Sequence, residues 1–310
     1  MATDFYYPSY GKGMIHGCRW DPVGKTIGVV QIVHGVAEHV GRYDHFAEYL
    51  ANLGFLVVAQ DHMGHGGSIG EEGVRGYMDG GWFKAVADVY RLLGHMQLEC
   101  PDVPYIVLGH SMGSFLVRSL LCKYPRCGIS AAILSGTAWM HRGVLNSGIA
   151  AATMVGKRNG FDQPSAMLNS MMFGGYNKRV EHKRTAFDWL TRDDKIVDAY
   201  IADPLCGFTV TAGLARDMLT GLKYIQEPEN LERMNKDLPV LFIAGNADPV
   251  GNYGEGVRKT ANAFARAGME NVSMRLYPLC RHEVLNELNR EEVYGHIVQW
   301  LQRQGICQLD

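Results

Sequence analysis

The 310-residue sequence has no marked excess of charge of either sign, because 30 Lys and Arg stand against 32 Asp and Glu. A chain this close to neutral has no electrostatic reason to bind nucleic acid. It also lacks any apolar run near the roughly 18 residues that a membrane span needs. The first residues lack the basic and apolar parts of a secretory signal. We therefore expect a globular cytoplasmic protein with ample apolar material for a core.

Cysteine and metal-binding patterns are equally sparse. The seven cysteines are odd in number and scattered, so we expect reduced thiols rather than a disulfide framework. Cys122 and Cys127 have no second Cys/His pair at metal-ligand spacing. His62 and His65 lie close together, but a loop with three glycines is a poor metal cage. We therefore predict no metal site.

Short apolar runs alternate along the chain with amphipathic stretches, and the sequence contains no internal repeat and no low-complexity segment. This alternation is typical of a mostly parallel sheet flanked by helices. We expect strands at residues 14–20, 27–33, 55–60, 105–108, 130–134, 240–244 and 272–277. We expect helices at residues 43–53, 83–98, 111–124, 253–267 and 290–304.

The alternation breaks between about residues 137 and 236. This segment reads as several helices, and we predict a helical cap (lid) inserted into a core made of residues 1–136 and 237–310. Methionine and aromatic residues are common in it: Trp139, Met140, Met154, Phe161, Met167, Met171, Met172, Phe173, Tyr176, Phe187 and Trp189. Each by itself is more simply explained as lid core, but as a group they suit a pocket for variable apolar ligands.

The most informative motif is Gly109-His110-Ser111-Met112-Gly113, which lies between an expected strand and an expected helix. This arrangement predicts a nucleophile elbow, a sharp turn that exposes the serine hydroxyl. The turn forces Ser111 into a strained conformation, so residues 109 and 113 must be small to let the strand and helix pass. We expect His110, at a variable position of the elbow, to point away from the catalytic base.

A serine that attacks an acyl carbon needs a histidine base and a carboxylate that orients it. In a sheet of this kind the chain order is serine, acid, histidine, each after a strand. Asp248 follows the expected strand 240–244, and His282 follows the strand 272–277. We therefore predict that Ser111, Asp248 and His282 form a catalytic triad.

The tetrahedral intermediate of acyl transfer also needs N–H donors directed at its oxyanion. We assign one donor to the backbone of Met112, the residue after the nucleophile. The other belongs to the loop after strand 27–33, which begins with His34-Gly35, and we assign it to the N–H of Val36.

Five motifs together resemble the monoacylglycerol lipase and bacterial lysophospholipase branch of the α/β-hydrolases, with its serine aminopeptidase S33-type members. They are residues 34–43 (HGVAEHVGRY), 61–68 (DHMGHGGS), 109–114 (GHSMGS), 247–250 (ADPV) and 282–287 (HEVLNE). The resemblance covers residues 10–301 and implies an α/β-hydrolase fold and a cofactor-free serine esterase acting on single-chain lipids. The lid shows no close match to that of the mammalian lipase, so the substrate is less constrained than the chemistry.

Other functions remain open on the sequence. The same triad serves esterases of small esters and thioesterases, and an aminopeptidase would need an acidic cluster such as Asp193, Asp194 and Asp198. A non-catalytic ligand-binding protein would have no need of a complete triad. Any contact with a membrane or micelle would have to rest on apolar lid residues. Cys280, two residues before His282, is a candidate for inhibition by thiol reagents, although a buried apolar role is the simpler reading.

Overall fold

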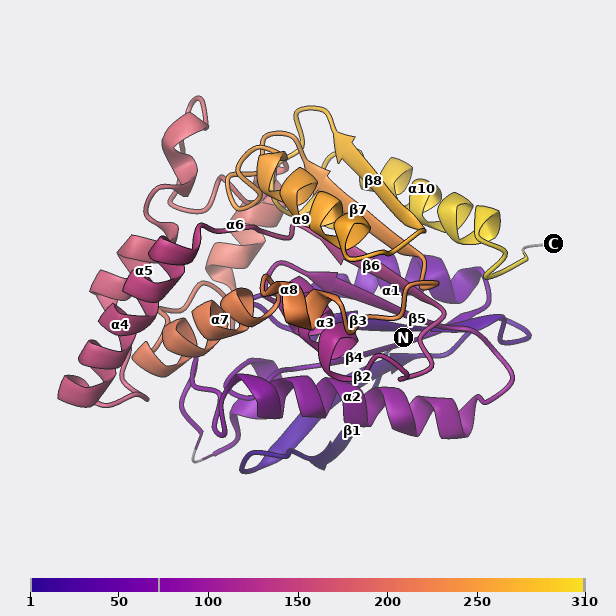
Figure 1. Ribbon diagram of the computed structural model, residues 1–310, viewed down its shortest axis with the longest axis horizontal. Helices are drawn as coiled ribbons and strands as arrows, with labels where there is room; N and C mark the ends of the chain where they lie inside the picture. Colours follow the sequence, from indigo (N-terminus) through magenta and orange to yellow (C-terminus); the bar gives the residue numbers. More distant parts are fainter. Residues whose placement is uncertain (1, 72, 309–310) are drawn as a thin grey trace.

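In the computed structural model, which describes residues 2–71 and 73–308, one twisted eight-stranded sheet organises the chain (Figure 1). Its strands are β1 (Thr3–Pro8), β2 (Met14–Trp20), β3 (Gly28–Val33), β4 (Phe55–Gln60), β5 (Tyr105–His110), β6 (Ala131–Ser135), β7 (Val240–Gly245) and β8 (Val272–Tyr277). Their spatial order is β1-β2-β4-β3-β5-β6-β7-β8. Strand β2 is antiparallel to both neighbours, and the other pairs are parallel.

Helices cover both faces of the sheet, which explains why β3 to β7 are uninterrupted apolar runs. Helices α1 (Asp44–Asn52) and α10 (Arg290–Arg303) pack on one face. Helices α2 (Trp82–Glu99), α3 (Met112–Lys123) and α9 (Glu255–Arg266) pack on the other. Side chains of β3 alternate between the two cores, with Val29 in one and Val30 in the other. Each of these elements was expected from the sequence, with ends that differ by at most two residues.

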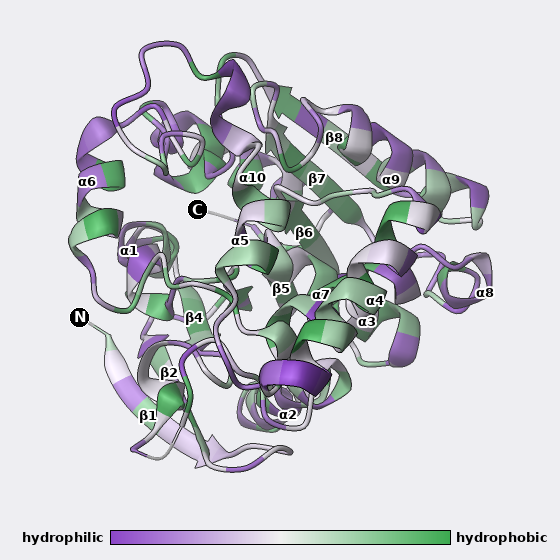
Figure 2. Ribbon diagram, turned by 90° about the vertical axis from the view of Figure 1, so that its left-hand side faces the viewer, coloured by the Kyte–Doolittle hydropathy of each residue, from purple (hydrophilic) through white to green (hydrophobic). Residues whose placement is uncertain are grey.

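Between β6 and β7 the chain forms only helices and loops in place of the strand–helix alternation. The helices are α4 (Arg142–Asn159), α5 (Ala166–Phe173), α6 (Asp194–Ala202), α7 (Ala212–Tyr224) and α8 (Pro228–Leu231). Helices α4 to α7 gather at one end of the sheet in Figure 1, and Figure 2 views the molecule from that side. Helix α7 also joins the core on the α3 face through Leu214 and Leu222. Short 3-10 turns lie at η1 (Val40–Tyr43), η2 (Gly66–Ile69), η3 (Tyr176–Arg179) and η4 (Val284–Asn286).

The first strand was not expected from the sequence. Strand β1 pairs antiparallel with β2 at the edge of the sheet, and of its six residues only Tyr7 is buried. Its exposed side chains leave no apolar alternation to detect. Among the described residues, a search for helices able to cross a bilayer finds none.

Candidate active site

Ser111 lies in the tight turn between β5 and α3. Its backbone has φ 51° and ψ −119°, in the region that non-glycine residues rarely adopt, and the side chain is 9% exposed. A Cβ at position 109 would come within 2.5 Å of the Gly113 carbonyl oxygen, and a Cβ at position 113 would collide with the Val33 carbonyl. The predicted need for small residues at both positions is therefore confirmed. The strand and helix can approach closely only because both residues are glycine.

Asp248 and His282 come together from loops after β7 and β8. His282 Nδ1 lies 3.0 Å from Asp248 Oδ2, and both side chains are buried. Asp248 Oδ1 accepts a hydrogen bond of 2.8 Å from the Val250 N–H, which fixes the carboxylate. An Nδ1–H bonded to a carboxylate leaves Nε2 as the basic nitrogen of the imidazole. Ser111 and His282 line the same cavity.

The surroundings of His282 tune its basicity. Burial opposes protonation, but the charge of Asp248 and its hydrogen bond outweigh burial, so the pKa of His282 is raised above its usual 6.5. The ring packs against Trp189, with the ring centroids 5.2 Å apart. The loop that carries His282 is also hydrogen-bonded to the segment between β6 and β7, because the Glu283 N–H donates to the Leu190 carbonyl at 2.7 Å.

The expectation that His110 points away from the base is wrong. Its ring centroid lies 4.7 Å from that of His282, and both rings line the cavity. Gly136, at φ 59°, makes this approach possible, because a Cβ there would come 2.9 Å from His282 and 3.3 Å from His110. Burial and the neighbouring charge of His282 lower the pKa of His110 to about 4. His110 is therefore a neutral neighbour of the candidate base at ordinary pH.

The predicted oxyanion loop passes directly beside the serine. A Cβ on Gly35 would come 3.1 Å from Ser111 Cβ, so the close approach depends on glycine at this position. Val36 lines the cavity, and Met112 is the buried first residue of α3. Within the described residues, neither the Val36 N–H nor the Met112 N–H donates to a protein acceptor. The N–H of a first helical residue has no partner within its helix, which leaves it available to an anion.

A buried ionic cluster under this loop was not foreseen. Glu38 Oε1 accepts hydrogen bonds from the Gly35 N–H at 2.5 Å and from the Tyr43 hydroxyl at 2.8 Å. Arg42 bonds Glu38 at 2.7 Å and holds both carboxylate oxygens of Glu283 at 2.6 and 2.7 Å. The guanidinium thus joins the oxyanion loop to the residue beside His282. The charged side chains of Glu38, Arg42 and Glu283 are visible in the sequence. No local pattern there predicts that Glu283 lies opposite Arg42.

These parts surround one cavity of about 670 Å³, within the usual range for small-molecule sites. The walls come from the oxyanion loop, the elbow, the His282 loop and the segment between β6 and β7. Of the predicted lid residues, Met140, Met171, Met172, Phe173, Tyr176, Phe187 and Trp189 line it, whereas Met154 and Met167 are exposed to solvent. Its lining is predominantly apolar.

Other sequence candidates lie outside the cavity lining of the described chain. Cys280 is completely buried, and its thiol donates a hydrogen bond to Asn289 Oδ1 at 3.1 Å. Thiol reagents therefore cannot reach it in the folded protein, contrary to the expectation from the sequence. Asp194 and Asp198 pair with Arg184 on an exposed face, and Asp193 pairs with Arg290. The acidic cluster required by an aminopeptidase is therefore not directed at Ser111.

The rings of His34, His62 and His65 pack against one another at tilted angles at the start of the predicted oxyanion loop, and all three are buried. His62 Nε2 lies 3.1 Å from the His34 carbonyl, and the His62 N–H donates to His34 Nε2 at 3.0 Å. Burial lowers the pKa of His65 to about 4 and moves the other two in the same direction. Neutral rings that hydrogen-bond the backbone of this loop and of the loop at residues 61–68 are suited to a structural role in supporting them.

Comparison with known proteins agrees with this geometry. The family model for serine aminopeptidase, S33, matches residues 24–289. A monoacylglycerol lipase of Mycolicibacterium smegmatis is 33% identical over 91% of this chain and 90% of its own. A monoglyceride lipase of Mus musculus is 32% identical over 74% of this chain and 69% of its own. A solved carboxyl esterase from Bacillus coagulans is 29% identical, with a TM-score of 0.90 over 97% of this chain and 98% of its own. By sequence and by fold, the chain belongs to the serine aminopeptidase S33 family of α/β-hydrolases.

Proposed function

We propose that this protein is a serine hydrolase that cleaves carboxylic esters of single-chain lipids, such as monoacylglycerols or lysophospholipids. The observation that carries the proposal is the mostly apolar 670 Å³ cavity, which holds Ser111 and His282 in one lining. Relatives named as monoacylglycerol and monoglyceride lipases support the substrate class. The similarity to the solved carboxyl esterase supports hydrolysis of an ester bond.

In the proposed mechanism, Ser111 Oγ attacks the ester carbonyl while His282 Nε2 accepts the hydroxyl proton. Asp248 holds the imidazole through Nδ1 and stabilises its positive charge. The N–H groups of Val36 and Met112 receive the oxyanion. His282 then protonates the departing alcohol, which leaves an acyl-enzyme. Water, deprotonated by His282, releases the fatty acid and restores Ser111.

We further propose that residues 137–236 act as a lid and bind the acyl chain. Their contribution to the cavity wall supports this role. The exposed side chains of Val144, Met154, Met167 and Met171 on α4 and α5 suit transient contact with a micelle or membrane surface. The seven cysteines are free in the described residues, and we propose a reducing, cytoplasmic setting for the protein.

The triad is tested by covalent labelling with a fluorophosphonate. Ser111→Ala should abolish labelling and lower kcat by roughly a millionfold, as when the nucleophile of a triad acting as a unit is removed. Ser147→Ala is the matched control, because this serine lines the same cavity and should retain both labelling and turnover. Labelling that persists in Ser111→Ala would contradict the assignment.

The substrate class is tested separately with nitrophenyl esters of increasing chain length. Burial of each methylene contributes about 0.8 kcal/mol, so kcat/KM should rise up to roughly fourfold per carbon beyond butyrate. A maximum at acetate would exclude lipid substrates and leave a small-molecule esterase. Faster turnover of thioesters or amino-acid anilides than of esters would instead identify a thioesterase or a peptidase.

A further inference from the structure

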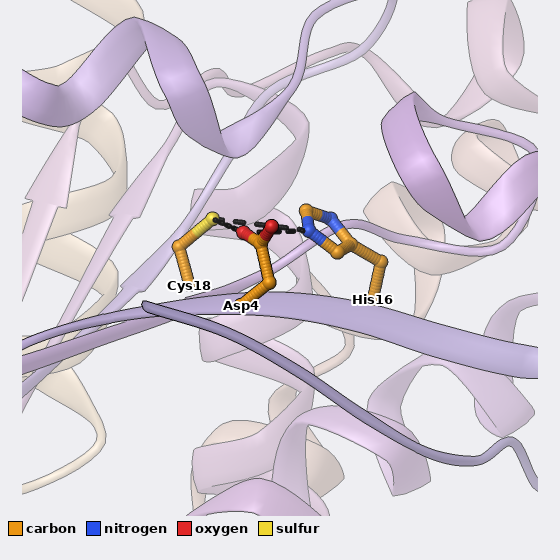
Figure 3. A group of neighbouring side chains, drawn as sticks. All are labelled: Asp4, His16 and Cys18. Atoms are coloured by element: carbon orange, nitrogen blue, oxygen red, sulfur yellow. Dashed lines mark hydrogen bonds and ion pairs between the residues drawn. The ribbon is translucent and has the colours of Figure 1, made fainter. Parts of the chain in front are cut away.

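A second group of chemically reactive side chains lies on the edge strand β1 and its neighbour β2. Asp4 on β1 is paired directly with Cys18 on β2, and His16 lies two residues before Cys18 on the same face. Figure 3 shows the three side chains converging on one point. His16 Nε2 lies 3.2 Å from Asp4 Oδ1, Cys18 Sγ lies 3.4 Å from that oxygen, and Sγ lies 3.9 Å from Nε2.

These separations match those of a tetrahedral metal site. Zinc binds nitrogen and oxygen at about 2.0–2.2 Å and sulfur at about 2.3 Å, so two of its ligand atoms lie roughly 3.3–3.7 Å apart. The separation of 3.4 Å lies within this range, and those of 3.2 and 3.9 Å fall only slightly outside it. A cation could therefore be bound with small side-chain movements and no rearrangement of the strands.

The orientation of His16 supports the same conclusion. Its Nδ1 lies 2.7 Å from Asp61 Oδ2, and Asp61 is almost completely buried. The N–H groups of Val40 and Gly67 hold the Asp61 carboxylate at 2.9 and 2.8 Å. A carboxylate that accepts from Nδ1–H is the usual partner of a metal-binding histidine. In the metal-free chain the Nε2–H donates to Asp4 Oδ1, and loss of this proton leaves the Nε2 lone pair directed toward Asp4 and Cys18.

The chain contains a second His/Asp/Cys group that lacks this feature. His39, Asp203 and Cys206 also lie close together, and His39 Nε2 is 2.7 Å from Asp203 Oδ2. However, His39 Nδ1 accepts the Gly41 N–H at 3.2 Å, so the ring proton resides on Nε2. Metal binding through Nε2 would require loss of this proton while Nδ1 remains an acceptor, which an imidazole resists. The second group therefore provides a matched control.

We propose that Asp4, His16 and Cys18 form a binding site for a zinc-like divalent cation, with Asp61 as the positioning residue. One nitrogen, one thiolate and one carboxylate oxygen are a donor set that favours zinc over magnesium or calcium. Asp4 is 64% exposed at its side chain, which gives the ion a route from solvent and leaves the fourth position to water. On binding, the Cys18 thiol and the His16 Nε2–H each release a proton to solvent.

The site would link the edge strand β1 to β2. In the described chain none of its three ligands belongs to the lining of the active-site cavity. We therefore assign the cation a stabilising role, and the inference does not depend on the proposed esterase function.

The test is titration of the full-length, chelator-treated protein with Zn²⁺ by calorimetry and with Co²⁺ by absorption spectroscopy. We expect one ion per chain and a sulfur-to-cobalt charge-transfer band, with a higher Tm in the presence of Zn²⁺. Cys18→Ser and Asp4→Asn should each weaken binding at least tenfold, and Cys18→Ser should remove the band. Asp61→Asn should weaken binding roughly 10–100-fold, as loss of an outer partner does.

Cys206→Ser should bind both ions as the unmodified protein does. Turnover of a nitrophenyl ester and far-ultraviolet circular dichroism establish that each variant is folded. Unchanged binding in Cys18→Ser, loss of binding in Cys206→Ser, or absence of the cobalt–sulfur band in the unmodified protein would each overturn the proposal.

Discussion

At the scale of single residues, the most consequential contact is the hydrogen bond between His282 and Asp248. The sequence placed both residues at strand ends, but only the folded structure shows that the carboxylate of Asp248, against the opposing effect of burial, raises the pKa of His282. In the mechanism that we propose, His282 is the general base, and such a base works only when neutral. We therefore expect activity above the folded-state pKa and its loss as the pH falls through that pKa.

We therefore expect the acid limb of kcat/KM to have its midpoint above pH 6.5. In Asp248→Asn the favourable charge is lost while burial remains, so the midpoint should move to lower pH and kcat should fall about 10⁴-fold. A pH–rate profile with nitrophenyl butyrate measures both effects. The exposed Asp198→Asn is the control and should keep the original profile. An unshifted limb in Asp248→Asn would show that another group titrates.

The second prediction at this scale concerns Gly136. Because it has no side chain, it leaves room for the rings of His110 and His282 to pack against each other. Gly136→Ala should destabilise the protein by about 1–2 kcal/mol through its left-handed backbone. It should also reduce kcat at least tenfold by displacing His282. Gly24→Ala has a comparable φ of 82° with nothing within 4 Å of the new Cβ, so it should show only the stability loss in a urea titration. Equal kcat losses in the two variants would contradict the role given to Gly136.

At the scale of elements, Arg42 connects loops that are 241 residues apart in the chain. Both carboxylates and the guanidinium are nearly inaccessible, so removing the cation leaves two buried negative charges unpaired. Arg42, despite the cost of burial, lowers the pKa of Glu283 to about 2 from its usual 4.5. A depressed carboxyl pKa stabilises the fold above pH 4.5, and this contribution is lost as the pH falls toward 2.

Arg42→Met should lower the free energy of unfolding by about 3–5 kcal/mol, the usual loss when one partner of a buried ion pair is removed. Arg42→Lys should recover only part of it, because an ammonium cannot hold both Glu283 oxygens in the planar geometry of a guanidinium. Urea unfolding at pH 7 measures the difference. Lys259→Met, which removes an exposed pair with Glu255, should change stability by less than about 1 kcal/mol.

The elements also differ in how readily the sequence predicts them. Strands β3 to β7 are buried on both faces, so their apolar runs mark them clearly. Strand β1 is mostly exposed and has no such pattern, although its pairing with β2 brings Asp4 to Cys18. The helices of residues 137–236 were expected only as a group, because their apolar residues are divided among core, cavity and solvent.

At the scale of the whole molecule, buried neutral histidines should make the fold sensitive to acid. His65 and His110 have folded-state pKa values of about 4, below the usual 6.5. Between pH 6.5 and 4 the unfolded chain therefore binds protons that the folded chain does not, so stability falls as the pH falls.

Each of these histidines should remove about 1.4 kcal/mol of stability per pH unit in this window. Urea midpoints at several pH values between 7.5 and 5 measure the slope. His65→Gln should reduce the slope by the contribution of one group, and the exposed His45→Gln should leave it unchanged. A slope that is insensitive to His65→Gln would show that acid destabilisation arises elsewhere.

The sequence alone determined the strand and helix pattern of the core, the small residues around Ser111 and the strand ends that carry Asp248 and His282. These features are local, because a few consecutive residues are enough to determine an elbow or the end of a strand. Only the tertiary structure decided that His110 packs on His282 across Gly136, that Arg42 joins Glu38 to Glu283, and that Cys280 is closed to reagents. It also decided the shape of the cavity and the register that brings Asp4 to Cys18. Such contacts join distant segments through packing and strand pairing, which leave no periodic signal in the chain.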